Sequence, residues 1–166
     1  MRIRDAEMEE LSLIRNQRVC AYEEYALMLS HDHWLDLKKS ITSDSDIQPG
    51  VELIVAEDNG EILGSVALFP PNTDAYKGYV EKIPVPELRM LAISLVGRGR
   101  GIGSALVNEC IDRTKRNGYN SIGLHSADVM TNAIKLYERF GFNRVPELDF
   151  EPSDDGILVK AYRLDF

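Results

Sequence analysis

Residues 87–104 constrain the fold of this chain more than any other stretch. Glu87 to Ser94 carries the run of apolar residues typical of a strand, and the glycines between Gly97 and Gly101 end it. Apolar residues recur at helical spacing from Ile102 onward, so we expect a strand, a glycine-rich turn and a helix that begins near Gly101. Such a helix start offers unpaired backbone N–H groups and the positive end of the helix dipole. The segment is therefore suited to bind an anion such as a diphosphate.

The kind of anion site can be narrowed by comparison with known phosphate loops. A nucleotide P-loop requires a lysine after its last glycine, whereas here Gly103 is followed directly by Ser104. A dinucleotide fingerprint would continue from Gly99 and Gly101 to a third glycine at position 104, and no acidic residue ends a second strand about twenty residues later. From these residues alone, an ordinary tight turn with two surface arginines remains an alternative to a phosphate site.

Two blocks of sequence resemble one enzyme family. Arg98–Gly103, RGRGIG, resembles the R-x-x-G-x-G signature of the GCN5-related N-acetyltransferase (GNAT) superfamily, and Leu91–Ile93 resembles the strand segment that precedes it. Ala133–Phe142, AIKLYERFGF, resembles the A-I-x-L-Y-E-x-x-G-F helix ending of the same family. The two motifs occur in the expected order and spacing. The resemblance covers residues 51–150 well and the first fifty residues only in their general organisation.

The resemblance implies a cofactor and a set of site residues. It implies that the glycine loop binds the pyrophosphate of acetyl-CoA, the acetyl donor, and that the preceding strand pairs with its pantetheine arm. The cofactor-binding residues implied in this way are Leu91, Ala92, Ile93, Arg98, Gly99, Arg100, Gly101, Ile102, Gly103 and Ser104. Many family members have an asparagine three residues before the motif alanine, where this chain has Met130, and Asn132 lies nearby. This departure leaves the contact from that helix open.

Transfer of an acetyl group to an amine also requires a base and an acid. Glu87 lies at the position where several histone-modifying members of the family place their glutamate base, and His125, at the end of the next strand, is the rival candidate. Tyr137 matches the family's general-acid tyrosine, which would protonate the departing thiolate. The oxyanion would be met by a backbone N–H near Ala92 or Ile93. For Glu87, His125 and Tyr137 alike, the alternative to a catalytic role is a purely structural one.

The order of predicted elements indicates one domain, an N-acetyltransferase domain spanning residues 1–166. We expect strands at 1–4, 51–57, 61–69, 87–94, 119–125, 141–145 and 157–164, and helices at 6–26, 33–41, 101–117 and about 126–140. The fold class is therefore α/β (α+β): a GNAT-like mixed, mostly antiparallel twisted sheet of six to seven strands with helices on both faces. Residues 72–86 form the longest irregular stretch, either a lid over the acceptor site or a surface crossing.

Composition limits the remaining possibilities. A chain of 166 residues with 44% hydrophobic and 28% charged residues is typical of a single soluble globular domain. The net charge of −8 argues against nucleic-acid binding. We find no signal peptide and no apolar run long enough to span a membrane, so we expect a cytoplasmic location. Cys20 and Cys110 are expected to be reduced core thiols, Asp32 to cap the helix that follows it, and no metal site is expected.

The sequence thus predicts an N-acetyltransferase that passes the acetyl group of acetyl-CoA to a primary amine by direct attack in a ternary complex. The acceptor is an unidentified small molecule or peptide. The alternative is a non-catalytic acyl-CoA-binding or regulatory domain of the same fold, and a plain nucleotide-binding module is disfavoured by the missing loop lysine. The protein is expected to be a monomer or a homodimer, in which the last strand could pair with its copy.

Overall fold

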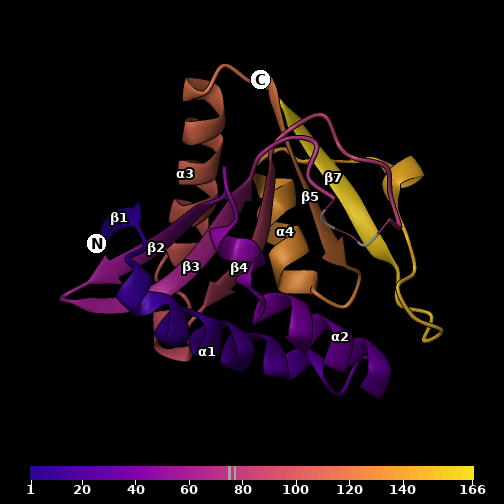
Figure 1. The fold of residues 1–166 in the computed structure, drawn as a ribbon, viewed down its shortest axis with the longest axis horizontal. Coiled ribbons are helices and arrows are strands. Elements are labelled where there is room, and N and C mark those ends of the chain that lie inside the picture. Colours follow the sequence, from indigo (N-terminus) through magenta and orange to yellow (C-terminus); the bar gives the residue numbers. More distant parts are fainter. Residues whose placement is uncertain (75, 77) are drawn as a thin grey trace.

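The computed structural model describes residues 1–74, 76 and 78–166 and contains one mixed sheet with helices on both sides (Figure 1). The strands are β1 (Arg2–Asp5), β2 (Glu52–Asp58), β3 (Glu61–Phe69), β4 (Glu87–Ile93), β5 (Ser121–Ala127), β6 (Asn143–Arg144) and β7 (Val159–Asp165), and the helices are α1 (Leu11–Tyr22), α2 (His31–Ile41), α3 (Ile102–Arg116) and α4 (Thr131–Arg139). This order of elements confirms the predicted one.

The sheet has the order β1-β2-β3-β4-β5-β7-β6. Neighbouring strands are antiparallel except for β4 and β5, which run parallel and pair only at Glu87 and Gly123. The predicted mixed, mostly antiparallel sheet is therefore confirmed. Because β4 and β5 pair only where β4 begins, the two strands diverge beyond this point and the sheet opens between them. The candidate active site lies at this opening.

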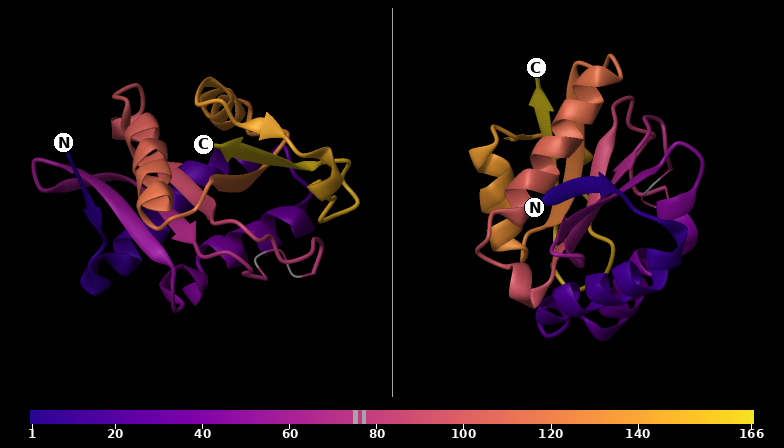
Figure 2. Two further views of the ribbon diagram at one scale, coloured as in Figure 1. Left: turned by 90° about the horizontal axis from the view of Figure 1, so that it is seen from above. Right: turned by 90° about the vertical axis from the view of Figure 1, so that its left-hand side faces the viewer.

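Each face of the sheet carries its own hydrophobic core, as Figure 2 illustrates with α3 and α4 on one side and α1 and α2 on the other. Successive side chains of a strand point to opposite faces. In β2, Ile54 and Ala56 accordingly join the core beneath α3 and α4, whereas Leu53 and Val55 join the core around Ile14 of α1. The nearly continuous apolar sequences of β2 and β3 follow from this two-sided burial.

Several local predictions are confirmed at the turns. The β2–β3 hairpin turns at Asn59 and Gly60, both with positive φ (51° and 78°), as the Asn-Gly pair predicts. Gly101, with φ of 76°, precedes the first residue of α3, and Gly141, with φ of 96°, follows α4.

Three predictions are wrong. The N-cap of α2 is Ser30, whose hydroxyl accepts a hydrogen bond from the backbone N–H of His33, so Asp32 lies inside the first turn. Cys20 is exposed, because it faces away from the buried side of α1, although Cys110 is fully buried as expected. The last strand, β7, is not a free edge, since it lies between β5 and β6.

Candidate active site

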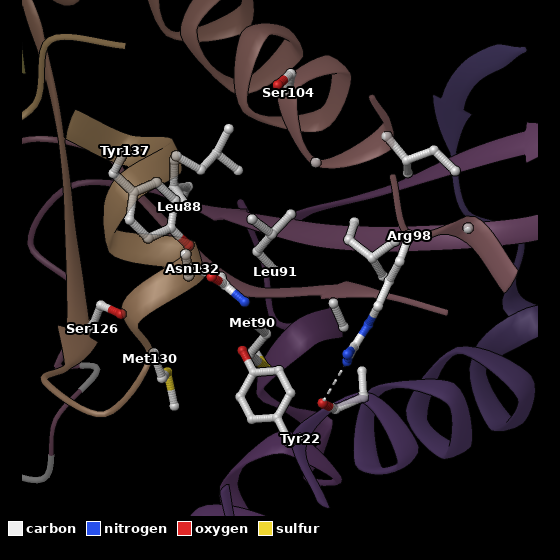
Figure 3. A pocket seen from close by; sticks show the side chains of 18 of the residues that line it. Tyr22, Leu88, Met90, Leu91, Arg98, Ser104, Ser126, Met130, Asn132 and Tyr137 are labelled. Carbon is white, nitrogen blue, oxygen red and sulfur yellow. Dashed lines mark hydrogen bonds between the residues drawn. The ribbon is translucent and has the colours of Figure 1, made fainter. Parts of the chain in front are cut away.

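A groove of about 400 Å³ runs along β4 where the sheet opens toward β5 (Figure 3). Its walls are β4, the glycine loop, the first turns of α4, and the end of α1 with the turn that follows it. All but one of the predicted cofactor-binding residues line it: Leu91, Ala92, Ile93, Arg98, Gly99, Gly101, Ile102, Gly103 and Ser104. The two blocks of sequence that carry the family resemblance thus face one another across a single groove.

The glycine loop presents backbone at one end of this groove. Gly99 and Gly101 both have positive φ, near 75°, and a Cβ atom built on either would meet no atom within 4 Å. These glycines are needed for backbone conformation rather than for space. The N–H groups of the first turn of α3, which follows, have no partner within the helix. The loop and helix therefore direct several backbone donors and the helix dipole at the groove, which suits an anion.

A third glycine of the loop is needed for packing. A Cβ atom on Gly97 would lie 2.8 Å from the backbone oxygen of Leu63, so a side chain there would displace β3 or the loop. Gly103, in the first turn of α3, would place its Cβ 3.2 Å from Leu136 of α4. The absence of side chains at these positions lets the loop lie against the sheet and lets α3 approach α4.

The two loop arginines lie in different places. Arg98 lines the groove, and its guanidinium donates to Glu24 (2.9 Å) and to the backbone oxygen of Ala21 (3.4 Å), as the dashed line in Figure 3 shows for one of these contacts. Arg100 pairs instead with Asp58 (2.6 Å) at the β2–β3 turn, and among the described residues it does not line the groove. Of the two loop arginines, only Arg98 therefore lies in the groove, where it would have to exchange Glu24 for a phosphate.

A β-bulge distorts β4 at the middle of the site. Between the pairs Ser65–Ala92 and Ala67–Arg89 the register shifts, so one residue of β3 faces two of β4. Met90, in the bulge, has a φ of 58°, a left-handed conformation that costs on the order of 1–3 kcal/mol for a residue with a side chain. Bulges of this kind release backbone groups from sheet pairing and are common beside active sites.

A second cavity, of about 490 Å³, lies on the other side of this bulge. We call it the acceptor pocket, after the role that "Proposed function" gives it. It is enclosed by α2, the end of β3, the segment around Tyr76 and Tyr79, and the loop before β7. Six residues line both cavities and therefore mark their junction: Tyr22, Arg89, Met90, His125, Ser126 and Met130. A ligand in the groove and another in the acceptor pocket would meet at this junction.

Tyr137 lies on the groove side of the junction. In Figure 3 its ring projects into the groove from α4, while Tyr22 projects from α1 on the opposite wall. Tyr137 is 5% exposed and contacts Phe142 edge-to-face, so much of the ring belongs to the hydrophobic core. Burial raises the pKa of Tyr137 well above its usual value, and the hydroxyl is therefore protonated at neutral pH. A hydroxyl in this state can donate a hydrogen bond to an anion.

The two candidate bases, Glu87 and His125, contact each other. The Nδ1 atom of His125 lies 3.1 Å from a carboxylate oxygen of Glu87, and its Nε2 atom lies 3.0 Å from the backbone oxygen of Leu148. Because a carbonyl can only accept, Nε2 must carry a hydrogen. A hydrogen bond between Nδ1 and the carboxylate forms only when one of the two carries a further proton, so a neutral imidazole beside an ionised carboxylate can take up one proton at this contact.

Of Glu87 and His125, only the histidine faces the two cavities. The His125 side chain is 1% exposed and that of Glu87 8% exposed, and only His125 is among the described residues that line the two cavities. Tyr76 lies against the pair, with its ring centroid 4.3 Å from that of His125. Burial, together with the Glu87 carboxylate, raises the pKa of Tyr76 well above its usual value.

Described residues of the irregular segment between β3 and β4 line the acceptor pocket. Tyr79 stacks on Phe150 with ring centroids 5.1 Å apart, and its hydroxyl donates to the backbone oxygen of Pro152 (3.1 Å). Two residues of this segment, Ala75 and Lys77, lie outside the described part of the chain. Thr73, Asp74, Tyr76 and Tyr79 of this segment line the acceptor pocket, which a lid over the acceptor site would also do, and a lid stays a prediction.

Several residues at the junction were missed by sequence reasoning. Tyr22, Tyr76 and Arg89 come from three segments without a motif, and nothing in their spacing indicates that they meet. Arg89 is two residues after Glu87 on the same strand, and residues two apart in a strand point to the same face. This spacing is the one signal in the sequence that could have placed the two side chains together. At the start of α4, both Met130 and Asn132 line the groove. Although Met130 replaces the asparagine of the family pattern, the groove therefore has a polar side chain two residues later.

Comparison with known proteins agrees with this geometry. The family model described as "Acetyltransferase (GNAT) family" matches residues 12–142. Over 126 residues the chain is 29% identical to N-acetyltransferase 8 of Rattus norvegicus, an alignment that covers 76% of this chain and 53% of that protein. It is 30% identical over 111 residues to an uncharacterized N-acetyltransferase of Schizosaccharomyces pombe, covering 67% of this chain and 63% of the relative.

Solved structures show the same fold over the whole chain. The PaiA N-acetyltransferase of Thermoplasma acidophilum, determined in complex with coenzyme A, superposes with a TM-score of 0.72 at 16% identity and covers 99% of this chain and 98% of its own. The chain spans about half to two thirds of the length of the first curated relatives it matches. In the described residues, every helix is too short or too polar to cross a lipid bilayer. With a family model that matches most of its length, the chain belongs to the GNAT family of acetyltransferases.

Proposed function

We propose that the protein transfers the acetyl group of acetyl-CoA to a primary amine by direct attack in a ternary complex. The observation that carries this proposal is the junction of two cavities at the bulge of β4, where a donor and an acceptor could meet without a covalent enzyme intermediate. Family membership supports the acetyltransferase class, and the coenzyme A bound to the Thermoplasma relative supports the donor.

The groove residues match the chemistry of this donor. The backbone donors of the glycine loop, together with Arg98, would bind the pyrophosphate. Residues 91–93 of β4 would pair with the amide groups of the pantetheine arm. At the bulge, backbone N–H groups released from the β3–β4 ladder would stabilise the oxyanion that forms at the thioester carbonyl. Arg100 would contribute only after its contact with Asp58 is broken.

Two proton movements complete the proposed reaction. The ammonium of the acceptor must lose a proton, and we assign this proton to the Glu87–His125 pair through water in the acceptor pocket. Tyr137, which remains protonated at neutral pH, would donate to the departing thiolate. A free thiol has a pKa of about 8.5, so the thiol is the stable product at neutral pH, and the proton that Tyr137 gives up would be replaced from solvent, which receives the proton of the ammonium.

The test is calorimetric titration of the protein with acetyl-CoA, with ATP and NAD as controls, followed by measurement of thiol release with a panel of amines. Binding of acetyl-CoA alone together with amine-dependent thiol release supports the proposal. Binding of acetyl-CoA without release for any amine would favour the non-catalytic acyl-CoA-binding alternative. Binding of ATP or NAD instead would contradict both functions.

A further inference from the structure

Arg89, at the junction of the two cavities, is a half-buried cation without a carboxylate partner among the described residues. Its guanidinium carbon lies 4.7 Å from the ring centroid of Phe69 and 4.5 Å from that of Tyr76. Most other arginines of the chain do have carboxylate partners: Arg4, Arg15, Arg18, Arg98, Arg100, Arg113, Arg116 and Arg144. An unpaired cation inside a cavity is costly unless a ligand compensates its charge.

The contacts of Arg89 leave most of its five N–H groups available, because its one side-chain hydrogen-bond partner among the described residues is Tyr76. Stacking on aromatic rings uses the faces of the guanidinium, whereas its N–H groups point outward in the plane and match the two oxygens of a carboxylate. The neighbouring acid, Glu87, is engaged with His125 and forms no ion pair with Arg89 in the described structure. Tyr76 stays neutral, because burial raises its pKa, and so it cannot neutralise Arg89.

The position of Arg89 sets where an anion would lie relative to the reacting amine. Arg89 precedes the bulge residue Met90 and shares the junction with His125. An acceptor amine that reaches the junction would therefore place an anionic group attached close to it in the part of the site that Arg89 lines. An α-amino acid has this arrangement, with its amine and carboxylate on one carbon.

The rest of the acceptor pocket indicates the side chain of such an acceptor. Its lining is largely aromatic and aliphatic, and includes Leu29, Leu37, Val51, Phe69, Tyr79, Phe150 and Val159. The acidic lining residues Asp36 and Asp74 are exposed, which places them toward solvent rather than beside Arg89. The interior therefore combines one cation at the junction with an apolar cavity beyond it.

We propose that Arg89 binds the carboxylate of the acceptor, and that the acceptor is an α-amino acid with an apolar side chain that fills the acceptor pocket. This inference rests on the proposed acetyltransferase function and names the substrate class of the same site.

The test compares L-phenylalanine with phenethylamine, which has the same ring and amine but lacks the carboxylate. In the unaltered protein we expect kcat/KM for phenylalanine to exceed that for phenethylamine by about ten- to a hundredfold, the range for a hydrogen-bonded charge pair. Arg89→Met should reduce this ratio to within about threefold, and Arg89→Lys should give an intermediate ratio. Arg116→Met, at an exposed arginine outside both cavities, should leave the ratio unchanged.

The outcomes separate this inference from the proposed function. Acetylation of both compounds with a ratio that does not depend on Arg89 overturns the inference and retains the acetyltransferase. If neither compound is acetylated, the CoA-loaded protein is titrated with N-acetyl-L-phenylalanine, and the inference is overturned if this product does not bind or if Arg89→Met does not weaken its binding. Failure of the unaltered protein to bind acetyl-CoA overturns the proposed function itself. Thermal unfolding of each variant establishes that it is folded.

Discussion

The groove and the acceptor pocket meet at the same strand but are built in different ways. The groove is lined mainly by two nearly continuous segments, residues 88–104 and 130–139, with the end of α1 and the turn after it on the opposite wall. The acceptor pocket is lined by side chains from α1, α2, β3, β4, β5, β7 and five connecting segments. Backbone recognition depends on glycines and on the positions where elements begin, so it constrains the sequence locally. Side-chain recognition can change at one position without altering the fold, so it is the part of the site suited to specificity.

The two cavities also differ in what holds their walls. The groove lies over the larger core, in which β4, α3 and α4 share buried residues such as Leu106 and Ile134. The acceptor pocket is closed by a few contacts between distant segments, among them the pair His33–Asp155 (2.7 Å) and the hydrogen bond from Tyr79 to Pro152. We therefore expect the groove to be the more resistant part of the site to changes of pH and to substitution.

The largest effect should come from Tyr137, which belongs to the groove wall. Tyr137→Phe keeps the buried ring but removes the proposed acid, so we expect kcat to fall by about a hundredfold or more while acetyl-CoA affinity changes less than about twofold. Steady-state kinetics and calorimetry on the same preparation measure both. A loss of affinity as large as the loss of kcat would instead assign Tyr137 to binding, and an unchanged kcat would remove it from the mechanism.

A smaller effect is expected at Glu87, which is buried and reaches the junction only through its contact with His125. Glu87→Gln preserves the shape of the side chain but removes the site that shares a proton with His125. We expect kcat to fall by about ten- to a hundredfold, with a change in the pH dependence of kcat/KM on its acidic side. The matched control is Glu109→Gln on α3, which also removes a partly buried carboxylate. A lower Tm for Glu87→Gln with an unchanged pH profile would show that Glu87 acts only in folding.

The His33–Asp155 contact at the acceptor pocket predicts that the free energy of unfolding depends on pH. Hydrogen bonds from Ser30, His33 and Ile157 lower the pKa of Asp155 to about 2, although burial opposes this shift. Since the pKa is near 3.9 in an unfolded chain, the ionised carboxylate stabilises the fold by about 2 kcal/mol above pH 4, and this contribution is lost as the pH falls toward 2. Urea unfolding of the unaltered protein and of Asp155→Asn should therefore differ most near pH 5 and converge only as the pH falls through about 2. A constant difference would contradict the assignment.

The sequence predicted the groove, which is built from local backbone features, better than it predicted the junction, which is built from side chains of distant segments. The glycine loop, residues 91–93 and Tyr137 all line the groove, because glycines and helical spacing report local backbone geometry. The meeting of Glu87 with His125 was not predicted, since it depends on the register of the single β4–β5 pair. The same limit applies to Arg89 and Tyr76, which only the tertiary fold brings together. Errors such as the cap assigned to Asp32 arose where Ser30, just outside the expected range, supplied a better-placed oxygen.

The smallest predicted effect distinguishes the two loop arginines, which the motif alone treats as equivalent. Arg98 lines the groove, whereas Arg100 is held by Asp58, so Arg98→Ala should weaken acetyl-CoA affinity by about tenfold and Arg100→Ala by less than about twofold. The double variant should then resemble Arg98→Ala. Because Arg98 must leave Glu24 to reach a phosphate, Glu24→Gln should tighten binding slightly. Calorimetry at low and high salt measures each affinity, and equal losses for the two arginines would mean that the loop rearranges when the donor binds and that Arg100 also reaches the pyrophosphate.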